Sequence, residues 1–235
     1  RPGDLLAGEP RELSILFTDI RGFTSLSESL SPQDVVQLLN RYFTPMTAIV
    51  RNRKGTLDKF IGDALMAFWN APLDVPGHPA LAVDAALCMQ EQLEALNVEI
   101  EASFGIRLAM GAGIHTGQAY VGNMGSDDLI NYTLIGDNVN LASRLEGLCK
   151  RYGVPVVVSE HTMQGCGDAF AFVHLDVLRV KGKTKPVSIY WPMRLGTDEV
   201  FQQTMPQWMT ARSQYEQGDF AGAAAGFAAL AAAHP

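Results

Sequence analysis

The stretch Leu13-Ser-Ile-Leu-Phe-Thr-Asp-Ile-Arg-Gly-Phe-Thr24 decides the architecture of this chain. Residues 13–18 are apolar or β-favouring and predict a buried strand, which Asp19 ends. Gly22 then predicts a turn. A carboxylate at the end of a buried strand is more often a cap or turn former than a functional group, so Asp19 alone does not indicate a function.

Outward from this strand, the pattern of apolar residues alternates between helices and strands. Residues 31–55 predict a helix that Pro45 should kink or split. Two short strands joined by Ile61-Gly-Asp63 predict a β-hairpin with Asp63 at its tip. The other expected elements are helices at 79–100 and 138–150 and strands at 107–114, 119–122, 131–135, 154–158, 171–180 and 187–191. This order predicts an α+β fold with helices on one face of a mostly antiparallel sheet.

Composition and charge narrow the classes of function. The 235 residues carry 18 Lys+Arg and 25 Asp+Glu, and the formal net charge of −7 disfavours nucleic acid as a partner because phosphates are repelled. The three cysteines, Cys88, Cys149 and Cys166, form no CxxC pair, so neither a zinc site nor a disulfide framework is expected. Residues 221–233 are too short a run to span a bilayer. We expect a cytoplasmic domain, whether or not a longer parent protein is anchored in a membrane.

The two ends of the chain differ from its middle. Residues 1–10 hold two prolines and two glycines and predict a linker, which leaves 11–194 as the main domain. Residues 195–235 predict helices only, and their pattern approximates one tetratricopeptide unit. One such unit cannot bury its apolar face by itself. The tail is therefore either the first of several repeats or a helical hairpin that caps the domain, and its helices are a candidate surface for protein contacts.

Two pairs of polar residues are candidates for chemistry. Asp19 and Asp63 fall on adjacent central strands of the predicted sheet, where they could converge on Mg²⁺, an ion that takes a few carboxylates together with substrate phosphates. Asn140 and Arg144 are four residues apart on a predicted helix, and an amide and a guanidinium on one face suit a ribose and a phosphate. The alternative is a solvated helix face on which Arg144 pairs with an acid such as Glu146.

Five segments in a fixed order resemble the catalytic domain of class III adenylate/guanylate cyclases. They are Phe17-Thr-Asp-Ile-Arg-Gly-Phe-Thr24, Asp58-Lys-Phe-Ile-Gly-Asp63, Gly113-Ile-His-Thr-Gly117 with Tyr120-Val-Gly-Asn-Met-Gly125, residues 132–144, and Val180-Lys-Gly-Lys183. The resemblance covers residues 11–192. It implies a ferredoxin-like βαβ-βαβ fold and the conversion of ATP to 3′,5′-cyclic AMP and pyrophosphate in intracellular signalling. It also implies a head-to-tail homodimer with active sites between the protomers.

The same resemblance implies a role for each matching residue. Asp19 and Asp63 correspond to the carboxylates that hold two Mg²⁺ ions, for which Mn²⁺ can substitute, and the backbone carbonyl of Ile20 faces a metal. Asn140 corresponds to the residue that orients the ribose, and Arg144 to the one that stabilises the transferring phosphoryl group. In the family the two aspartates come from one protomer, and the other side chains of the site come from its partner.

The remaining matches concern the base and the triphosphate. Lys59 and Thr133 correspond to the pair that reads the purine: Lys59 can donate to N1 of adenine, and the Thr133 hydroxyl can accept from the N6 amino group. Guanine presents the opposite pattern, so we expect ATP rather than GTP as substrate. Lys181 corresponds to the residue that binds the terminal phosphates. Gln118 departs from the family pattern, because some relatives have an arginine there that reaches the phosphates.

Two other functions are less consistent with these residues. A regulatory nucleotide-binding module that has lost catalysis would lack one of the aspartates, Asn140 or Arg144, and all are present. A diguanylate cyclase would need a GG(D/E)EF-like hairpin, which Phe60-Ile-Gly-Asp63 does not supply. The cyclase reaction needs no protein nucleophile, so we interpret His115 as a structural residue of a strand.

Overall fold

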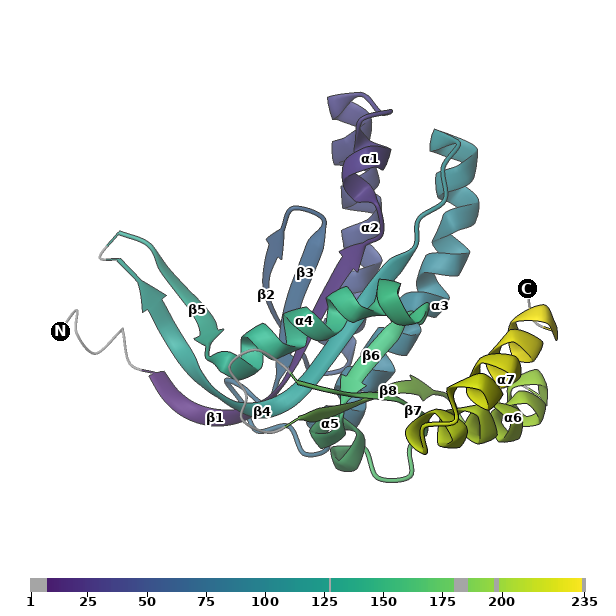
Figure 1. The fold of residues 1–235 in the computed structure, drawn as a ribbon. Coiled ribbons are helices and arrows are strands. Elements are labelled where there is room, and N and C mark those ends of the chain that lie inside the picture. Colours follow the sequence, from purple (N-terminus) through teal and green to yellow (C-terminus); the bar gives the residue numbers. More distant parts are fainter. Residues whose placement is uncertain (1–7, 127, 180–185, 197–198, 234–235) are drawn as a thin grey trace. The chain divides into compact units, whose positions relative to one another are not determined.

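An eight-stranded sheet with helices packed against it makes up the main part of the computed structural model (Figure 1). The structure describes residues 8–126, 128–179, 186–196 and 199–233. The strands are β1 (Gly8–Ile20), β2 (Thr56–Ile61), β3 (Ala64–Trp69), β4 (Met110–Gly125), β5 (Ile130–Ile135), β6 (Val156–Ser159), β7 (Ala171–Leu178) and β8 (Val187–Met193). The helices are α1 (Phe23–Ser27), α2 (Pro32–Asn52), α3 (His78–Phe104), α4 (Asp137–Tyr152), α5 (Glu160–Gly165), α6 (Glu199–Glu216) and α7 (Phe220–Ala233).

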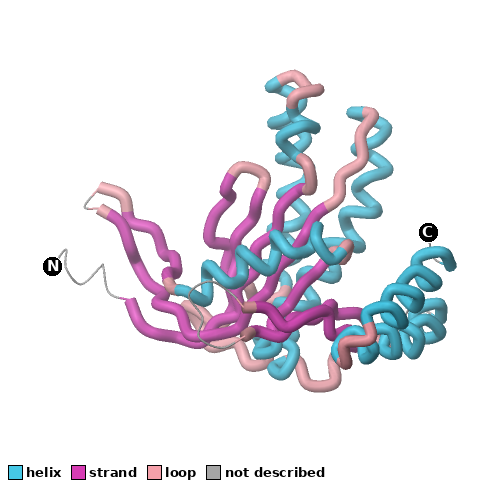
Figure 2. Tube along the Cα trace, viewed as in Figure 1, coloured by secondary structure: helices cyan, strands magenta, loops and turns pink. Residues whose placement is uncertain are grey.

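The strands lie in the order β2-β3-β1-β4-β6-β8-β7, and β5 pairs separately with β4 (Figure 2). Among the strand pairs of the described residues, only β4–β6 is parallel. The prediction of a mostly antiparallel sheet in an α+β fold is therefore confirmed. Strands β1 and β4 are central and pair along the whole length of β1, from Gly8 opposite Gly122 to Ile20 opposite Met110.

Helices cover both faces of the sheet, which corrects the expectation of a single helical face. On β3, Leu65, Ala67 and Trp69 pack with buried residues of α2 and α3. The alternate residues Met66 and Phe68 belong to a second cluster that includes Ala142 of α4. Because successive side chains of a strand point to opposite faces, α4 lies on the face opposite α2 and α3. Local periodicity shows which side of a helix is apolar, but not which face of the sheet receives it.

Helix α4 lies directly on β4 because β4 carries glycine at the contact. A Cβ atom on Gly113 would lie 2.5 Å from the carbonyl oxygen of Ala142 and 2.7 Å from the Cα of Glu146. Real Cβ atoms do not approach other atoms this closely, so only glycine fits without a shift of the helix. The motif Gly113-Ile-His-Thr-Gly117 thus has a packing role: it sets the distance between β4 and the helix that carries Asn140 and Arg144.

Buried polar side chains hold the first turn of α4. His115 on β4 contacts the Ser159 hydroxyl with Nδ1 at 2.7 Å and the Asn138 side-chain oxygen with Nε2 at 3.1 Å. The Asn138 amide donates in turn to the backbone carbonyl of Gln118 at 2.7 Å. Since an amide oxygen only accepts, Nε2 carries the proton. His115 is buried in a strand, in accordance with its structural interpretation.

Three boundaries differ from the expectations. Residues 8–10, expected in the linker, belong to β1 because β4 supplies their pairing partners, and residues 1–7 lie outside the described ranges. Strand β4 runs unbroken from Met110 to Gly125, where two strands were expected, because β1 and β5 pair with it across Gly117 and beyond. Helix α2 continues through Pro45, so the helix is not split in two there, and a kink at Pro45 stays a prediction.

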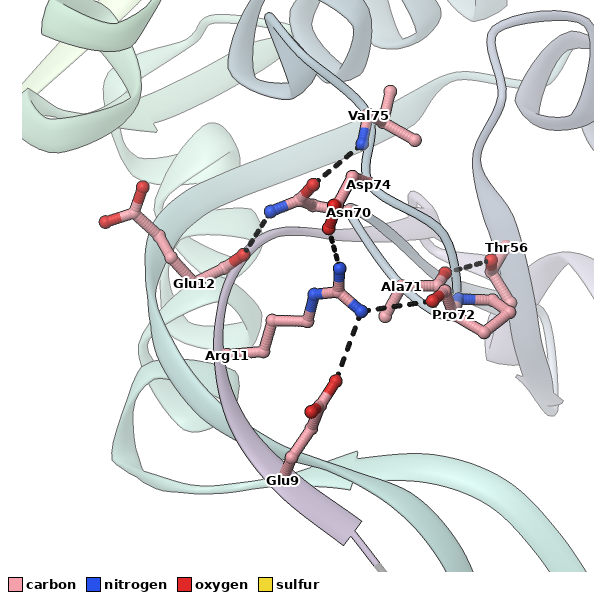
Figure 3. Close-up of polar contacts among 9 residues, drawn as sticks. All are labelled: Glu9, Arg11, Glu12, Thr56, Asn70, Ala71, Pro72, Asp74 and Val75. Atoms are coloured by element: carbon pink, nitrogen blue, oxygen red, sulfur yellow. Dashed lines mark hydrogen bonds and ion pairs between the residues drawn. The ribbon is translucent and has the colours of Figure 1, made fainter.

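The connection from β3 to α3 is tied to the start of β1 by polar contacts (Figure 3). Arg11 forms an ion pair with Asp74 and donates to the Pro72 carbonyl at 3.0 Å. The Asn70 amide donates to the Glu12 carbonyl at 3.0 Å. These contacts fix the loop that leads into α3 against the central strand.

The last two helices belong to a second compact unit, which spans Arg194–Pro235. Within it, Trp208 and Phe227 lie with ring centroids 6.2 Å apart, and Ala211 and Ala223 are buried. Gly226 allows this close packing, because a Cβ there would lie 2.7 Å from the Cβ of Ala211. The two helices form a hairpin, and its assignment to a tetratricopeptide-like region stays a prediction. Within the described ranges, no helix is long and apolar enough to cross a membrane.

The contact at Gly113 leads to a prediction about stability. Gly113→Val should lower the free energy of unfolding by about 3 kcal/mol or more, because overpacking against the backbone of α4 cannot be relieved by side-chain rotation. Chemical denaturation would measure this loss. Gly147 is the matched control, since a Cβ there would meet no atom within 4 Å. Gly147→Ala should be neutral or stabilising, and equal destabilisation by the two variants would contradict the close-contact argument.

Candidate active site

Two aspartates meet where β1 ends and the β2–β3 hairpin turns. Asp19 is the penultimate residue of β1, and Asp63 lies in the turn before β3, where Gly62 has a φ of +64°. The Ile20 N–H donates to the Asp63 carboxylate at 3.2 Å. Because β1 pairs directly with β3, the two carboxylates lie next to each other. The predicted convergence of Asp19 and Asp63 is therefore found in the structure.

The environment of Asp19 disfavours its negative charge. Burial, the hydrogen bond to Asp63 and the charges of Asp63 and Glu146 together raise the pKa of the Asp19 carboxyl to about 7. A cation placed between crowded carboxylates would relieve this repulsion. Among the described residues, no group of three or more His, Cys, Asp or Glu side chains is arranged to hold a metal by itself. Two carboxylates completed by substrate phosphates fit Mg²⁺, which keeps few protein ligands.

Glu146 is a neighbour of this pair that the sequence reasoning missed. It was considered only as a possible partner of Arg144. Its carboxyl is half-buried, and burial raises its pKa, whereas the charge of Arg21 lowers it and that of Asp63 raises it. Glu146 therefore faces the aspartates and Arg21. One feature of the sequence indicates this placement. Glu146 comes two residues after Arg144 on the same helix, so its side chain lies away from the exposed side and toward the sheet.

Asn140 and Arg144 lie on the exposed side of α4, one turn apart. The helix starts after Gly136 and is capped at Gly153, whose φ of +66° favours glycine. Its buried positions, Leu141 among them, face the sheet and leave the amide and the guanidinium accessible. The structure thus keeps the two side chains on a surface that a ligand can reach.

The two predicted purine-reading residues are brought together by a third side chain. Thr133 on β5 donates its hydroxyl hydrogen to the Asp58 carboxylate at 2.6 Å. The Lys59 ammonium lies 3.4 Å from the other oxygen of Asp58. Lys59 is thereby placed beside Thr133, although 73 residues separate them in the chain. Lys181, the predicted phosphate ligand, lies outside the described residues.

A comparison with known families identifies the domain. Residues 7–193 match the family model of the adenylate and guanylate cyclase catalytic domain. The chain belongs to this family. The ferredoxin-like architecture expected from the sequence is that of its solved relatives, the cyclase catalytic domains.

Three relatives show how close the similarity is. Adenylate cyclase 1 of Rhizobium meliloti is 40% identical over 180 residues, which are 77% of this chain and 27% of that protein. The adenylyl cyclase CyaB from P. aeruginosa has a TM-score of 0.75 at 33% identity, with 83% of this chain and 98% of that chain covered. The guanylyl cyclase Cya2 has a TM-score of 0.73 at 33% identity, with the same coverage. The chain thus spans about a quarter of the length of the curated relative.

The crowding at Asp19 leads to a prediction for the metal-free domain. With a folded pKa of about 7 and an unfolded value near 3.8, ionised Asp19 destabilises the fold fully above pH 7 and not at all below pH 4. Asp19→Asn should therefore raise the Tm at pH 8 in the presence of a chelator, and the gain should vanish toward pH 4. Thermal unfolding from pH 4 to pH 8 measures this.

The same variant tests whether Asp19 binds a divalent cation. Added Mg²⁺ or Mn²⁺ should raise the Tm of the unsubstituted protein at pH 8, because a ligand that binds only the folded state stabilises it. The Asp19→Asn variant should respond much less. An equal response of both proteins would show that Asp19 does not hold the ion.

Proposed function

We propose that this chain is an adenylate cyclase catalytic domain that converts ATP into 3′,5′-cyclic AMP and pyrophosphate. Membership of the cyclase family and the similarity to proteins named adenylate cyclases support the reaction. The comparisons alone do not decide the base, because the guanylyl cyclase Cya2 is as similar in sequence as the adenylyl cyclase CyaB. The observation that carries the choice of ATP is the placement of Lys59 beside Thr133, a donor and a hydroxyl that complement N1 and N6 of adenine.

The proposed metal site consists of Asp19, Asp63 and the backbone carbonyl of Ile20. Two Mg²⁺ ions, or Mn²⁺ in their place, would lower the pKa of the ribose 3′-hydroxyl and neutralise the triphosphate. The proximity of Asp19 and Asp63 and the raised pKa of Asp19 support a cation at this place. The carboxylates would hold these ions. The 3′-oxygen gives up its proton to solvent and bonds to the α-phosphorus in line, while the bond from that phosphorus to pyrophosphate breaks.

The side chains of α4 act on the other reacting groups. Asn140 positions the ribose by hydrogen bonds from its amide. Arg144 donates to the oxygens of the phosphoryl group as negative charge develops there, an effect that is typically worth several kcal/mol. Lys181 binds the terminal phosphates and holds pyrophosphate as it leaves. None of these residues forms a covalent bond to the substrate.

We propose that the active domain is a head-to-tail homodimer with shared active sites. Support comes from large apolar side chains that are exposed on the β2–β3 and β4–β5 hairpins. They are Phe60, Ile61, Tyr120, Leu129, Ile130 and Ile135. An exposed apolar patch on a folded domain marks an interaction surface, and a second copy of this chain would cover it.

The context of the domain follows from its relatives. Since the chain spans 27% and 37% of two related adenylate cyclases, we propose that it is the cytoplasmic output domain of a longer signalling protein. The helical hairpin of α6 and α7 carries exposed Met209, Tyr215 and Phe220, which suit contacts with a protein partner.

The choice of base gives the first test of this function. The protein should form cyclic AMP from ATP far faster than cyclic GMP from GTP. Lys59→Glu combined with Thr133→Cys should lower kcat/KM for ATP by about tenfold or more, because the donor and acceptor pattern is inverted. Product analysis of single-nucleotide reactions with Mg²⁺ or Mn²⁺ measures both. A preference for GTP in the unsubstituted protein would contradict the assignment.

Shared active sites give a second test. Asp19→Ala and Arg144→Ala homodimers should each be nearly inactive. When the two variants exchange subunits, about half of the dimers are mixed, and each mixed dimer has one intact site, so activity should recover to about a quarter of the unsubstituted level.

The complementation needs a control for exchange. Differently tagged chains that co-purify after mixing show that mixed dimers have formed. A mixture of two differently tagged Asp19→Ala proteins should stay inactive. Mixed dimers without recovered activity would mean that each protomer holds a complete site.

A further inference from the structure

Asp58 is a buried acid next to the active site that has no role in the reaction as described so far. The pairing of β2 with β3 shifts between Leu57, opposite Ala67, and Lys59, opposite Met66. Asp58 is therefore the extra residue of a β-bulge. Its side chain is 1% exposed, whereas that of Lys59 is 44% exposed. Bulges often re-aim a side chain near an active site, and here the bulge turns a carboxylate inward directly before an accessible lysine.

Both oxygens of this carboxylate contact the residues that we propose to read the base. One oxygen accepts the Thr133 hydroxyl hydrogen at 2.6 Å, and the other lies 3.4 Å from the Lys59 ammonium. The hydrogen bond runs from the Thr133 hydroxyl to the Asp58 carboxylate, and a carboxylate accepts hydrogen bonds. Thr133 must therefore be the donor in its bond with Asp58.

This direction of the hydrogen bond decides what Thr133 can offer a ligand. A threonine hydroxyl has one hydrogen and two lone pairs, and a free hydroxyl rotates to donate or to accept as the ligand requires. Such a hydroxyl would serve the N6 amino group of adenine and the O6 atom of guanine equally well. With its hydrogen held by Asp58, the Thr133 oxygen presents lone pairs only. It can then accept from an amino group but cannot donate to a carbonyl oxygen.

We infer that Asp58 is a specificity-determining positioning residue, which makes Thr133 a pure acceptor and holds Lys59 beside it as the donor. The pair then complements a purine with a hydrogen-bond acceptor at N1 and an amino group at C6. A 6-oxo purine places an oxygen against the lone pairs of Thr133 and a hydrogen against Lys59, and unpaired groups of this kind are strongly rejected. The inference rests on the proposed function, because it assigns the orientation of two side chains that read the base.

A purely structural role for Asp58 makes a different prediction. Its bond to Thr133 also joins β2 to β5, so its loss could lower stability without any effect on base choice. The informative readouts are therefore two ratios of kcat/KM values measured on one folded protein. The ATP to GTP ratio tests the direction of the Thr133 hydroxyl, and the ATP to purine riboside triphosphate ratio tests whether Thr133 reads the base. ATP and purine riboside triphosphate, which lacks only the 6-amino group, differ at the atom that faces Thr133.

The test compares Asp58→Asn with Thr133→Val. The unsubstituted protein should favour ATP over purine riboside triphosphate, and Thr133→Val should remove most of that preference. Asp58→Asn should lower the preference for ATP over GTP by about tenfold and leave the preference for ATP over purine riboside triphosphate unchanged, because an amide can donate to Thr133 as well as accept from it, so that the hydroxyl can turn to serve O6 or N6. In the Thr133→Val background, Asp58→Asn should leave the ATP to GTP ratio unchanged, because no hydroxyl remains for Asp58 to orient.

The control is a matched acid elsewhere in the domain. Asp84 on α3 is partly buried and pairs with Arg53, so Asp84→Asn also removes an ion-paired carboxylate. It should lower the Tm and leave both nucleotide ratios unchanged. If Asp58→Asn does not fold, Asp58→Ser provides the same readout, because a serine hydroxyl can bond with Thr133 in either direction.

The outcomes separate the inference from the function on which it rests. Absence of cyclic nucleotide from any substrate would overturn the proposed function. A Thr133→Val protein that keeps the preference for ATP over purine riboside triphosphate would remove Thr133 from base reading, and the inference with it. If Thr133→Val lowers that preference while folded Asp58→Asn and Asp58→Ser keep the ATP to GTP ratio of the unsubstituted protein, the role of Asp58 is overturned and the function stands.

Discussion

The contact between the backbones of α4 and β4 at Gly113 is the constraint on which the rest of the site depends. It seats the helix of Asn140 and Arg144 on the strand that pairs with β1, and β1 carries Asp19. Any side chain at Gly113 would push the helix outward and move its polar face relative to the aspartates. The hydrogen bonds from His115 then fix the first turn of the same helix.

The acids that crowd the active site destabilise the folded domain when no cation is bound. The ends of β1 and β3 bring Asp19 and Asp63 together, and Glu146 adds a third acid from α4. An apolar residue at position 19 would suit the buried end of a central strand better. The domain instead keeps a carboxylate whose pKa is about 7, which a bound cation would stabilise.

Base reading depends on contacts between distant strands. Thr133 and Asp58 are 75 residues apart, and the bulge in β2 turns the acid toward the threonine. The motif Asp58-Lys-Phe-Ile-Gly-Asp63 was visible in the sequence, but its first residue carried no signal of a partner on β5. An acid beside a lysine in a short strand ordinarily forms a solvent-exposed ion pair. Only the burial of the Asp58 side chain distinguishes it from such a pair.

The amino-acid sequence by itself determined the order of the helices and strands apart from the short α1 and α5, the place of Asp19 at a strand end and of Asp63 in a turn, and the shared face of Asn140 and Arg144. These features depend on side-chain periodicity and turn chemistry within a few residues. Only the tertiary structure decided that helices cover both faces, that β4 is one strand, and that Asp58 joins Thr133. Each of these follows from packing or pairing between segments far apart in the chain, and no local pattern records such contacts.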